Sequence, residues 1–281
     1  MQAHEGAFSV SAMCRVLEVT RSGHHAWKRR GDRLRDEENR RLDADIGRLF
    51  ALHKARYGAP RLTLELRERG WTVSRKRVAK RMRTLGLRAR AARKYRATTR
   101  SKHNLPVAPN RLGQDFTAKV PNRVWVSDIT YIWTEEGWLY LAAVLDLYAR
   151  SVVGWAMAER MTRELVVSAL TMAVWRRRPE PGVVVHSDRG GQYASGDYQA
   201  LLETQGFLCS MSRKGDCYDN AAMESFFHSL KVEQVNGCRY RTREEAKADV
   251  FEYIETYYNA VRRHSTLNYL SPRDFEKRRT P

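Results

Sequence analysis

Residues 124–158, VWVSDITYIWTEEGWLYLAAVLDLYARSVVGWAMA, decide the fold. The stretch is rich in Val, Ile, Tyr and Trp, which favour β-strands. Turn residues interrupt it at Glu136-Gly137 and at Arg150-Ser151. Three consecutive strands are therefore predicted, over 124–134, 138–147 and 152–158.

The sequence that follows alternates between helical and strand patterns. A helix with an apolar face is predicted over 162–177, and two further helices over 221–235 and 242–263. Between them, a strand over 182–186, a helix over 195–206 and a fifth strand over 207–211 are expected. This order is that of an RNase H-like fold, so we predict an α/β class, with a mixed five-stranded sheet flanked by helices.

The positive charge of the chain belongs to its first part. The net charge is +19, and residues 1–112 contain 29 Lys and Arg against 10 Asp and Glu, whereas residues 113–281 contain 22 of each. A folded cationic region favours binding to a polyanion through phosphate contacts, although it can also serve solubility. We predict a helix-turn-helix-like region (1–55), a second basic helical DNA-binding region with a linker (56–112), a catalytic core (113–235) and a helical extension (236–281).

Residues 9–30 predict two short helices around a turn, with Met13, Val16 and Leu17 on one face of the first. On the second, Ala26 and Trp27 are expected to pack inward. The side chains expected to point outward are Arg21, His24, His25 and Lys28. This is the shape of a helix-turn-helix, whose second helix contacts DNA, and also of a small structural pair of helices.

A second helical pair is more cationic. A helix over 32–53 is predicted to bury Leu42, Ile46, Leu49 and Phe50, and helices over 61–69 and 74–85 follow. The outward face of 74–85 favours an opposing phosphate backbone but also fits a solvated face. Residues 88–111 lack apolar periodicity, which predicts a linker along DNA. The candidate DNA-binding side chains are Arg61, Arg75, Lys76, Arg77, Lys80, Arg81, Arg88, Arg90, Arg93 and Lys94.

Three acidic residues mark the second half of the chain. Asp128 lies inside the first predicted strand, Asp188 follows the fourth, and Glu224 lies near the start of a helix. Carboxylate oxygens suit hard divalent cations such as Mg²⁺, and two such ions can clamp a phosphoryl group. A carboxylate left unpaired within an apolar strand would be costly. The three acids are therefore predicted to be catalytic metal ligands.

Several neighbours of the acids are candidates for supporting roles. Lys231 lies two helical turns after the third acid on about the same face, where it either contacts DNA or faces solvent. His186, Gln192 and Asn220 are expected to shape the site through hydrogen bonds or DNA contact. A fourth carboxylate, Asp146, also lies in an apolar run, and we expect it to be a structural partner of Arg150.

The composition argues against some classes of protein. No run of about 18 apolar residues is present, so no membrane span is expected. Residues 1–10 lack the charged start and apolar stretch of a signal peptide, which predicts a cytoplasmic protein. The four cysteines are scattered without a C-x-x-C pair, which disfavours a disulfide framework and a zinc site.

The sequence around the acids resembles one family. The motifs are Trp125-Val-Ser-Asp128-Ile-Thr-Tyr131, His186-Ser-Asp188-Arg-Gly-Gly-Gln-Tyr193 and Asp219-Asn-Ala-Ala-Met-Glu224, with Tyr57-Gly58-x-x-Arg61 before them and Tyr258-Asn259-Ala-Val-Arg262-Arg-His264 after them. In these the chain resembles, over nearly its whole length, the bacterial insertion-sequence transposases of the IS-three family, orf-B type. That family is a branch of the DDE superfamily, which includes retroviral integrases.

The resemblance implies a DNA transposase, a polynucleotidyl transferase in which water frees a 3′-hydroxyl at the element's end and that hydroxyl attacks another phosphodiester. It implies two Mg²⁺ ions, with Mn²⁺ as a substitute, and contact of Lys231 with the DNA end. The implied partners are the double-stranded terminal inverted repeats and target, other copies of the chain on DNA, and an upstream orf-A product, with no membrane. The implied location is the bacterial cytoplasm, at the nucleoid.

Two other functions stay open at this point. The first is an RNase H-like, structure-specific DNA nuclease, which would share the metal-binding carboxylates. The second is a non-catalytic repressor that only occupies element ends. The cationic first part disfavours the nuclease, and the intact acidic triad disfavours the repressor.

Overall fold

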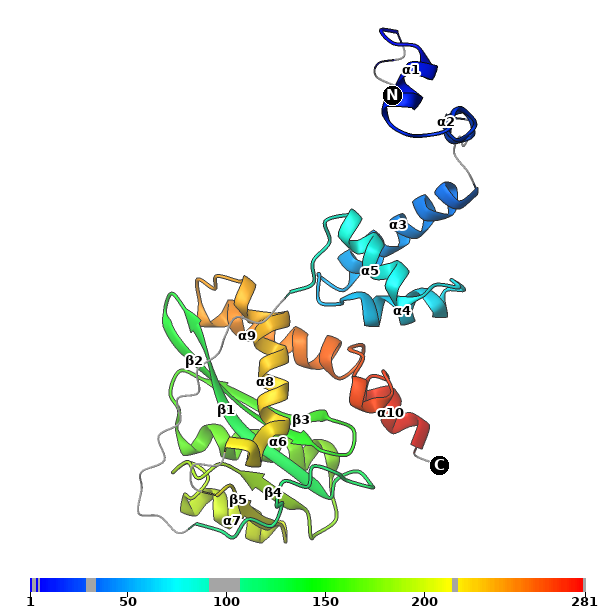
Figure 1. Cartoon of the computed structure of the whole chain (residues 1–281). Coiled ribbons are helices and arrows are strands. Elements are labelled where there is room, and N and C mark those ends of the chain that lie inside the picture. The colour runs from blue at the N-terminus through cyan, green and yellow to red at the C-terminus, as the bar shows by residue number, and fades with distance from the viewer. Residues whose placement is uncertain (2–3, 5, 29–33, 91–106, 214–216, 280–281) are drawn as a thin grey trace. The chain divides into compact units, whose positions relative to one another are not determined.

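The computed structural model describes residues 1, 4, 6–28, 34–90, 107–213 and 217–279. The chain forms two compact units, Met1–Ala89 and Arg90–Pro281. The helices of the first unit (Figure 1) are α1 (Val10–Val16), α2 (Arg21–Lys28), α3 (Leu34–Leu52), α4 (Ala59–Glu68) and α5 (Arg75–Thr84). Across the described residues, no helix has the length and apolar character needed to cross a bilayer.

Helices α3, α4 and α5 pack around a small apolar core. Leu42, Ile46 and Leu49 of α3 are buried as expected, and Phe50 is half-buried. The Ser74 hydroxyl caps α5 by accepting a hydrogen bond from the backbone N–H of Arg77. These contacts fix α4 and α5 as a helical pair braced by α3.

The predicted orientation of α2 is wrong in part. His24 is buried, whereas Ala26 and Trp27 are exposed, but Arg21, His25 and Lys28 are exposed as predicted. On α1, Met13 is buried, but Val16 is 81% exposed, and Leu17, which follows the helix, is exposed as well. Helices of seven and eight residues bury little area, so their inward faces depend on mutual packing rather than on side-chain polarity.

The second unit contains a mixed five-stranded sheet. Its strands are β1 (Val124–Thr134), β2 (Gly137–Asp146), β3 (Ser151–Ala158), β4 (Val184–Ser187) and β5 (Leu208–Met211), in the order β3-β2-β1-β4-β5. The first three strands are antiparallel, and β4 and β5 run parallel to β1. The predicted class, an RNase H-like mixed sheet flanked by helices, is confirmed.

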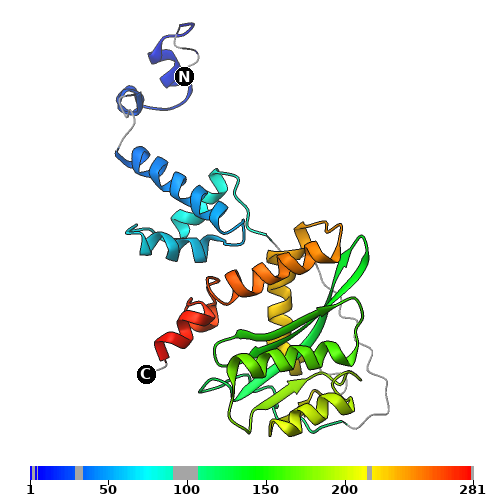
Figure 2. The same cartoon turned by 180° about the vertical axis from the view of Figure 1, so that it is seen from behind.

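Helices cover both faces of this sheet. The helices of this unit are α6 (Arg163–Arg177), α7 (Gly196–Thr204), α8 (Ala221–Glu233), α9 (Arg243–Phe251) and α10 (Pro272–Arg279). Figure 1 shows α8 across one face, and Figure 2 shows α6 and α7 in front of the other. The main apolar core lies between the sheet and α6 and α7, with Trp125, Leu170 and Tyr198 buried in it.

Helix α6 approaches β3 at Gly154. A Cβ atom at Gly154 would lie 2.2 Å from the carbonyl oxygen of Ala169 and 2.6 Å from the nitrogen of Ala173. A side chain of any size would therefore push the helix away from the sheet. The glycine and the two alanines that face it permit the close packing that holds this layer together.

The end of the chain differs from the prediction of one helix over 242–263. Helix α9 passes at Phe251 into a π-helical segment, Glu252–Tyr258, and α10 follows further on. The side-chain amide of Asn259 donates to the carbonyl of Val152 and accepts from its N–H, both at 2.9 Å. These contacts with β3 are made across 107 residues, so a local helical pattern does not reveal them.

Candidate active site

Asp128 lies on β1 just beyond the segment that pairs with β4. The parallel pairing joins Val124 to Val184, Trp125 to Val185 and Val126 to His186. Asp128 is half-buried, and its Oδ1 accepts a hydrogen bond from the backbone N–H of Ile129 at 2.7 Å. The carboxylate is therefore carried by a strand whose backbone is held on one side by β2.

The sheet register brings Asp188 to the level of Asp128. Val126 pairs with His186, and the two aspartates each follow that pair by two residues. Asp188 is half-buried, and its Oδ1 accepts from the N–H of Gly190 at 2.9 Å. A Cβ atom at Gly190 would lie 3.0 Å from that same oxygen and from Oε1 of Gln192, so the glycine makes room for both.

Glu224 lies in the first turn of α8 and is exposed. The residue that precedes this helix, Asn220, donates from Nδ2 to the carbonyl of Ser127 at 3.1 Å. Ser127 is the neighbour of Asp128 on β1. The hydrogen bond therefore fixes the start of the helix that carries Glu224 beside the strand that carries Asp128.

The charges of the three acids act on one another. Burial raises the pKa of Asp128 to about 8, and the charges of Asp188 and Glu224 also raise it. The N–H of Ile129 and the charge of Lys231 oppose this rise in pKa. Loss of surrounding water raises the pKa of Glu224 as well. The site thus disfavours its own negative charge, which a bound cation would stabilise.

The donor chemistry of the acids suits Mg²⁺, which prefers oxygen ligands. Among the described residues, no three His, Cys, Asp or Glu side chains are arranged closely enough to hold a metal ion as they stand. Oδ1 of both Asp128 and Asp188 accepts a backbone hydrogen bond. The charges of Asp188 and Glu224 act on Asp128, although the three side chains do not form a ready-made metal-binding cluster.

Lys231 faces this site rather than open solvent. Its Nζ lies 4.8 Å from the centre of the Tyr131 ring, and the side chain is half-buried. Burial lowers the pKa of Lys231, and the charge of Asp128 partly offsets that effect. The ammonium group is therefore held near the carboxylate of β1 by a cation–π contact.

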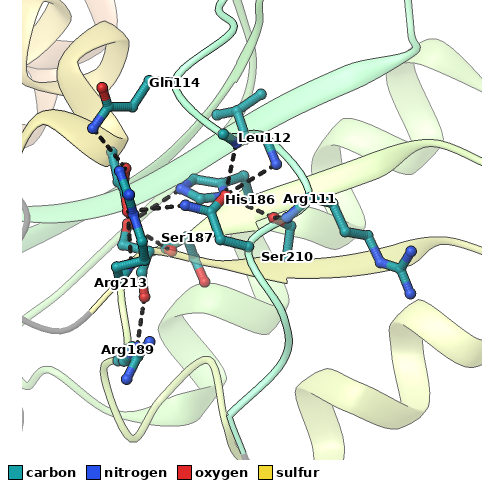
Figure 3. Close-up of polar contacts among 12 residues, drawn as sticks. Arg111, Leu112, Gln114, His186, Ser187, Arg189, Ser210 and Arg213 are labelled. Atoms are coloured by element: carbon teal, nitrogen blue, oxygen red, sulfur yellow. Dashed lines mark hydrogen bonds and ion pairs between the residues drawn. The ribbon is translucent and has the colours of Figure 1, made fainter.

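His186 and Gln192 make hydrogen bonds within the protein. Figure 3 shows His186 next to Ser210; its Nδ1 lies 2.8 Å from the Ser210 hydroxyl, and its Nε2 lies 3.2 Å from that of Ser212. Burial lowers the pKa of His186 to about 4, so the ring is neutral near pH 7. Gln192 donates from Nε2 to the carbonyl of Met161 at 3.2 Å.

Sequence reasoning missed Asp219, which is fully buried. Its carboxylate accepts hydrogen bonds from Asn110 at 2.9 Å, from Gln114 at 3.1 Å and from the backbone N–H of Arg213 at 2.6 Å; Figure 3 labels Gln114 and Arg213 in this cluster. The Arg213 side chain is the main cause of a pKa lowered to about 2. Its place in the third motif was a signal in the sequence, but two of its partners, Asn110 and Gln114, lie more than 100 residues away along the chain.

The cationic face of α5 is only partly free to meet phosphate. Arg77 donates from Nη1 to Glu38 at 3.0 Å, and Arg81 donates from Nε to Asp43 at 2.7 Å. The expectation that these two arginines point outward is wrong, because both pair with acids of α3. The exposed cations of α5 are Arg75, Lys76, Lys80 and Arg83, and Arg88 just beyond the helix is also exposed.

The other candidate DNA-binding residues differ in their contacts and in their exposure to solvent. Arg61 lies 5.2 Å from the centre of the Tyr57 ring. Arg90 donates from Nη1 to the carbonyls of Glu233 and Gln234, at 2.8 and 3.2 Å. Exposed residues of α2 include Arg21 and Lys28. Arg93 and Lys94 lie outside the described residues.

Asp146 is a structural residue, but its partner is not Arg150 as expected. It is fully buried and accepts hydrogen bonds from the N–H of Asn122 at 2.9 Å and from Nη2 of Arg177 at 3.3 Å. Arg150 donates instead to the carbonyl of Phe116 at 3.3 Å. The expected pairing fails because α6 brings Arg177 to the end of β2.

Comparison with known domains agrees with this architecture. Residues 118–217 and 224–279 each match a model described as an integrase core domain, and residues 36–95 match an HTH-like domain. The three matches include all three acids and helices α4 and α5. They define a polynucleotidyl transferase of the integrase and transposase class.

Similar proteins point to one family within that class. Transposase InsF for insertion sequence IS3A, from Escherichia coli strain K12, is 51% identical over 280 residues, which cover 99% of this chain and 97% of that protein. The insertion element IS600 uncharacterized 31 kDa protein of Shigella sonnei is 47% identical over 266 residues, covering 95% and 98%. The chain belongs to the IS3 family of insertion-sequence transposases.

Solved structures with some likeness come from retroviruses. A chain of the simian T-cell lymphotropic virus intasome in complex with PP2A regulatory subunit B56 gamma shares 16% identity at a TM-score of 0.48, covering 84% of this chain and 75% of that one. The trimeric form of the HTLV-2 integrase catalytic core domain in complex with magnesium shares 13% identity at a TM-score of 0.45, covering 57% and 99%.

Proposed function

We propose that Asp128, Asp188 and Glu224 are the catalytic residues of this transposase and that they hold two divalent cations, Mg²⁺ or Mn²⁺, during cleavage and strand transfer at element ends. One observation carries the proposal: the charges of Asp188 and Glu224 both raise the pKa of Asp128. Asp128, whose pKa responds to both of the other acids, would contribute oxygens to both ions, and Asp188 and Glu224 would each hold one.

The protein's own residues position the reaction. When bound, the two cations supply activation of the attacking oxygen and stabilisation of the leaving oxygen. Water is the nucleophile in cleavage and a DNA 3′-hydroxyl is the nucleophile in joining, so no side chain becomes covalently linked to DNA. Lys231 contacts a phosphate of the DNA end, because its ammonium group lies beside Asp128. Asn220 keeps the first turn of α8 against β1.

The basic first part of the chain binds the terminal inverted repeats. The HTH-like match covers α4 and α5, and the exposed cations Arg75, Lys76 and Lys80 lie on the second of these helices. Such side chains contact phosphates. Because an element has two ends, several copies of the chain act together on DNA, with the upstream orf-A product as a further partner, in the cytoplasm at the nucleoid.

A nuclease of the same fold is the main alternative function. It would cut DNA in the presence of a divalent cation but would not join a 3′-hydroxyl to a new strand. The HTH-like domain favours the transposase, since a structure-specific nuclease has no need of a region that reads element ends. Joined products therefore separate the two functions.

The test is a strand-joining assay with DNA that carries a labelled element end. We expect the wild-type chain to give joined products with Mg²⁺ or Mn²⁺ and none with EDTA. Glu224→Gln should abolish cleavage and joining while leaving end binding nearly unchanged. Glu203→Gln, an exposed carboxylate on α7, is the matched control and should retain activity. Equal loss of binding and joining in Glu224→Gln would refute the division between a binding part and a catalytic part.

A further inference from the structure

Three aromatic side chains form an exposed cluster on the β1–β2 hairpin. Trp133 and Trp138 are directly opposite in the register, with ring centres 4.8 Å apart, and Tyr131 lies 4.9 Å from Trp138. Trp133 is 59% exposed, Trp138 42% and Tyr131 37%. Rings of this size are usually covered in a folded protein. Their joint exposure indicates a binding surface.

The hairpin that carries the cluster is held by α9. The Arg243 guanidinium donates to the carbonyl of Glu136 at 2.7 Å and to that of Trp138 at 3.1 Å. The backbone N–H of Glu135 also donates to the carbonyl of Tyr240 at 3.0 Å. Because these bonds fix the tip of the hairpin, the rings are pre-organised, and binding costs little ordering of the backbone.

Lys231 connects the aromatic cluster with the candidate active site. Its ammonium group lies over the Tyr131 ring and acts electrostatically on Asp128. Along β1, Tyr131 and Trp133 lie three and five residues from Asp128, about 10–17 Å at 3.3 Å per residue. That span corresponds to about three to five base steps of 3.4 Å along one DNA strand. These odd offsets turn the rings to the other face of the strand from Asp128, and Lys231 is the side chain that reaches both Tyr131 and the charge of Asp128.

We propose that Tyr131, Trp133 and Trp138 form a stacking surface for unpaired bases of the DNA strand that reacts at Asp128, with Lys231 on the adjoining phosphate. The inference rests on the proposed function, since it takes the three acids as the reaction centre. Aromatic rings bind bases of any sequence through their π-faces, and cations beside them bind the backbone. The proposed ligand is therefore DNA whose strands are separated at the end of an element.

Charge favours nucleic acid over a protein as the occupant. The cluster adjoins the half-buried Lys231, whose ammonium group lies over the Tyr131 ring. A contact between copies of the chain would need a broad apolar patch, whereas this cluster is three rings bordered by that cation. Self-association through the rings is nevertheless a distinct outcome that the experiment detects.

The experiment compares two DNA probes in EDTA, so that no reaction occurs. Both carry 2-aminopurine a few nucleotides from the 3′ end; in one probe that end is unpaired, and in the other it is fully paired. With the wild-type chain we expect stacking to quench the fluorescence of the unpaired probe. Trp133→Ala should weaken binding of the unpaired probe by roughly 5- to 150-fold and leave binding of the paired probe nearly unchanged.

Matched variants make the result specific. Trp133→Phe should restore most of the binding. Trp175→Ala removes another exposed tryptophan, 72% accessible on α6, and should change neither probe. Thermal unfolding of each variant checks the fold.

Three results would overturn the inference: unchanged binding in Trp133→Ala, an equal loss for both probes, or altered sedimentation of the free protein with quenching preserved. Failure of the stacking surface differs from failure of the proposed function. If the wild type joins strands while Trp133→Ala binds unpaired DNA normally, only the stacking inference falls. If the wild type never joins strands, the proposed function falls, whatever the fluorescence shows.

Discussion

The guanidinium of Arg262 donates two hydrogen bonds to the buried carboxylate of Glu233, from Nε at 2.8 Å and from Nη2 at 2.7 Å. The hydroxyl of Tyr253 donates to the same carboxylate at 3.0 Å. Glu233 ends α8, whose first turn carries Glu224. The residues after α9 therefore hold the far end of the helix that supplies the third acid.

Replacing Arg262 with Leu should lower the free energy of unfolding by about 3–5 kcal/mol, because it leaves Glu233 buried without a countercharge. Urea denaturation measures the change. Glu233→Leu combined with Arg262→Leu is the control, and it should recover much of the loss because no buried charge remains. A single variant as stable as the wild type would show that the ion pair does not brace α8.

Gly154→Ala should destabilise the second unit. Its Cβ would lie 2.2 Å from the carbonyl oxygen of Ala169, and overpacking of this kind costs about 1–3 kcal/mol, sometimes more. Gly196→Ala on α7, where no atom lies within 4 Å of the added Cβ, should be neutral or slightly stabilising. Thermal unfolding compares the two, and equal melting temperatures would rule out the close approach of α6 to β3.

The contribution of Asp128 to the stability of the metal-free protein should fall as the pH rises from about 4 to 8. The unfolded chain releases the Asp128 proton near its ordinary pKa of about 3.9, whereas the folded protein keeps it up to about pH 8. Deprotonation between these values therefore favours the unfolded state. Asp128→Asn removes the penalty, so its Tm in EDTA at alkaline pH should exceed that of the wild type by on the order of 5 °C.

A divalent cation should act in the opposite direction. Mg²⁺ added at alkaline pH should raise the Tm of the wild type, because it binds the folded carboxylates, and should leave Asp128→Asn nearly unchanged. Differential scanning calorimetry with and without Mg²⁺ measures both effects. An equal rise in the two proteins would place the stabilising ion elsewhere.

Replacing the cations of α5 should weaken DNA binding at some positions and lower stability at others. Lys76→Ala and Lys80→Ala remove exposed side chains, so they should weaken DNA binding and reduce the slope of log K against log salt by about one each. Arg81→Ala should lower stability instead, because it breaks the pair with Asp43. Binding titrations over a range of salt, with parallel thermal unfolding, test the contrast; a reversed pattern would contradict it.

Local patterns predicted the sheet well. Strand β1 has the predicted bounds, Val124–Thr134, because a run of β-branched and aromatic residues between turns is a local signal. Helix α8 begins at residue 221 as predicted and ends at Glu233, two residues before the predicted end at 235. Asp188 lies near Asp128 because β4 pairs in parallel with β1. The predicted order of elements implied this pairing only by indicating an RNase H-like fold.

Features set by distant partners were not predictable in this way. Asp146 pairs with Arg177, 31 residues away, rather than with the near neighbour Arg150. Arg81 pairs with Asp43, 38 residues away, although every charged residue of its own helix is a cation. The buried face of α2, which includes His24, depends on packing between two short helices. In each case a tertiary contact outweighs the local pattern.

The most direct measurement of the central claim is an anomalous-scattering crystal structure of the protein bound to a DNA end in the presence of Mn²⁺. The account predicts two Mn²⁺ peaks, with an oxygen of Asp128 at about 2.0–2.3 Å from both and oxygens of Asp188 and Glu224 each at that distance from one. Peaks at another site, or a DNA-bound complex in which any of the three carboxylates stays beyond that reach, would contradict it.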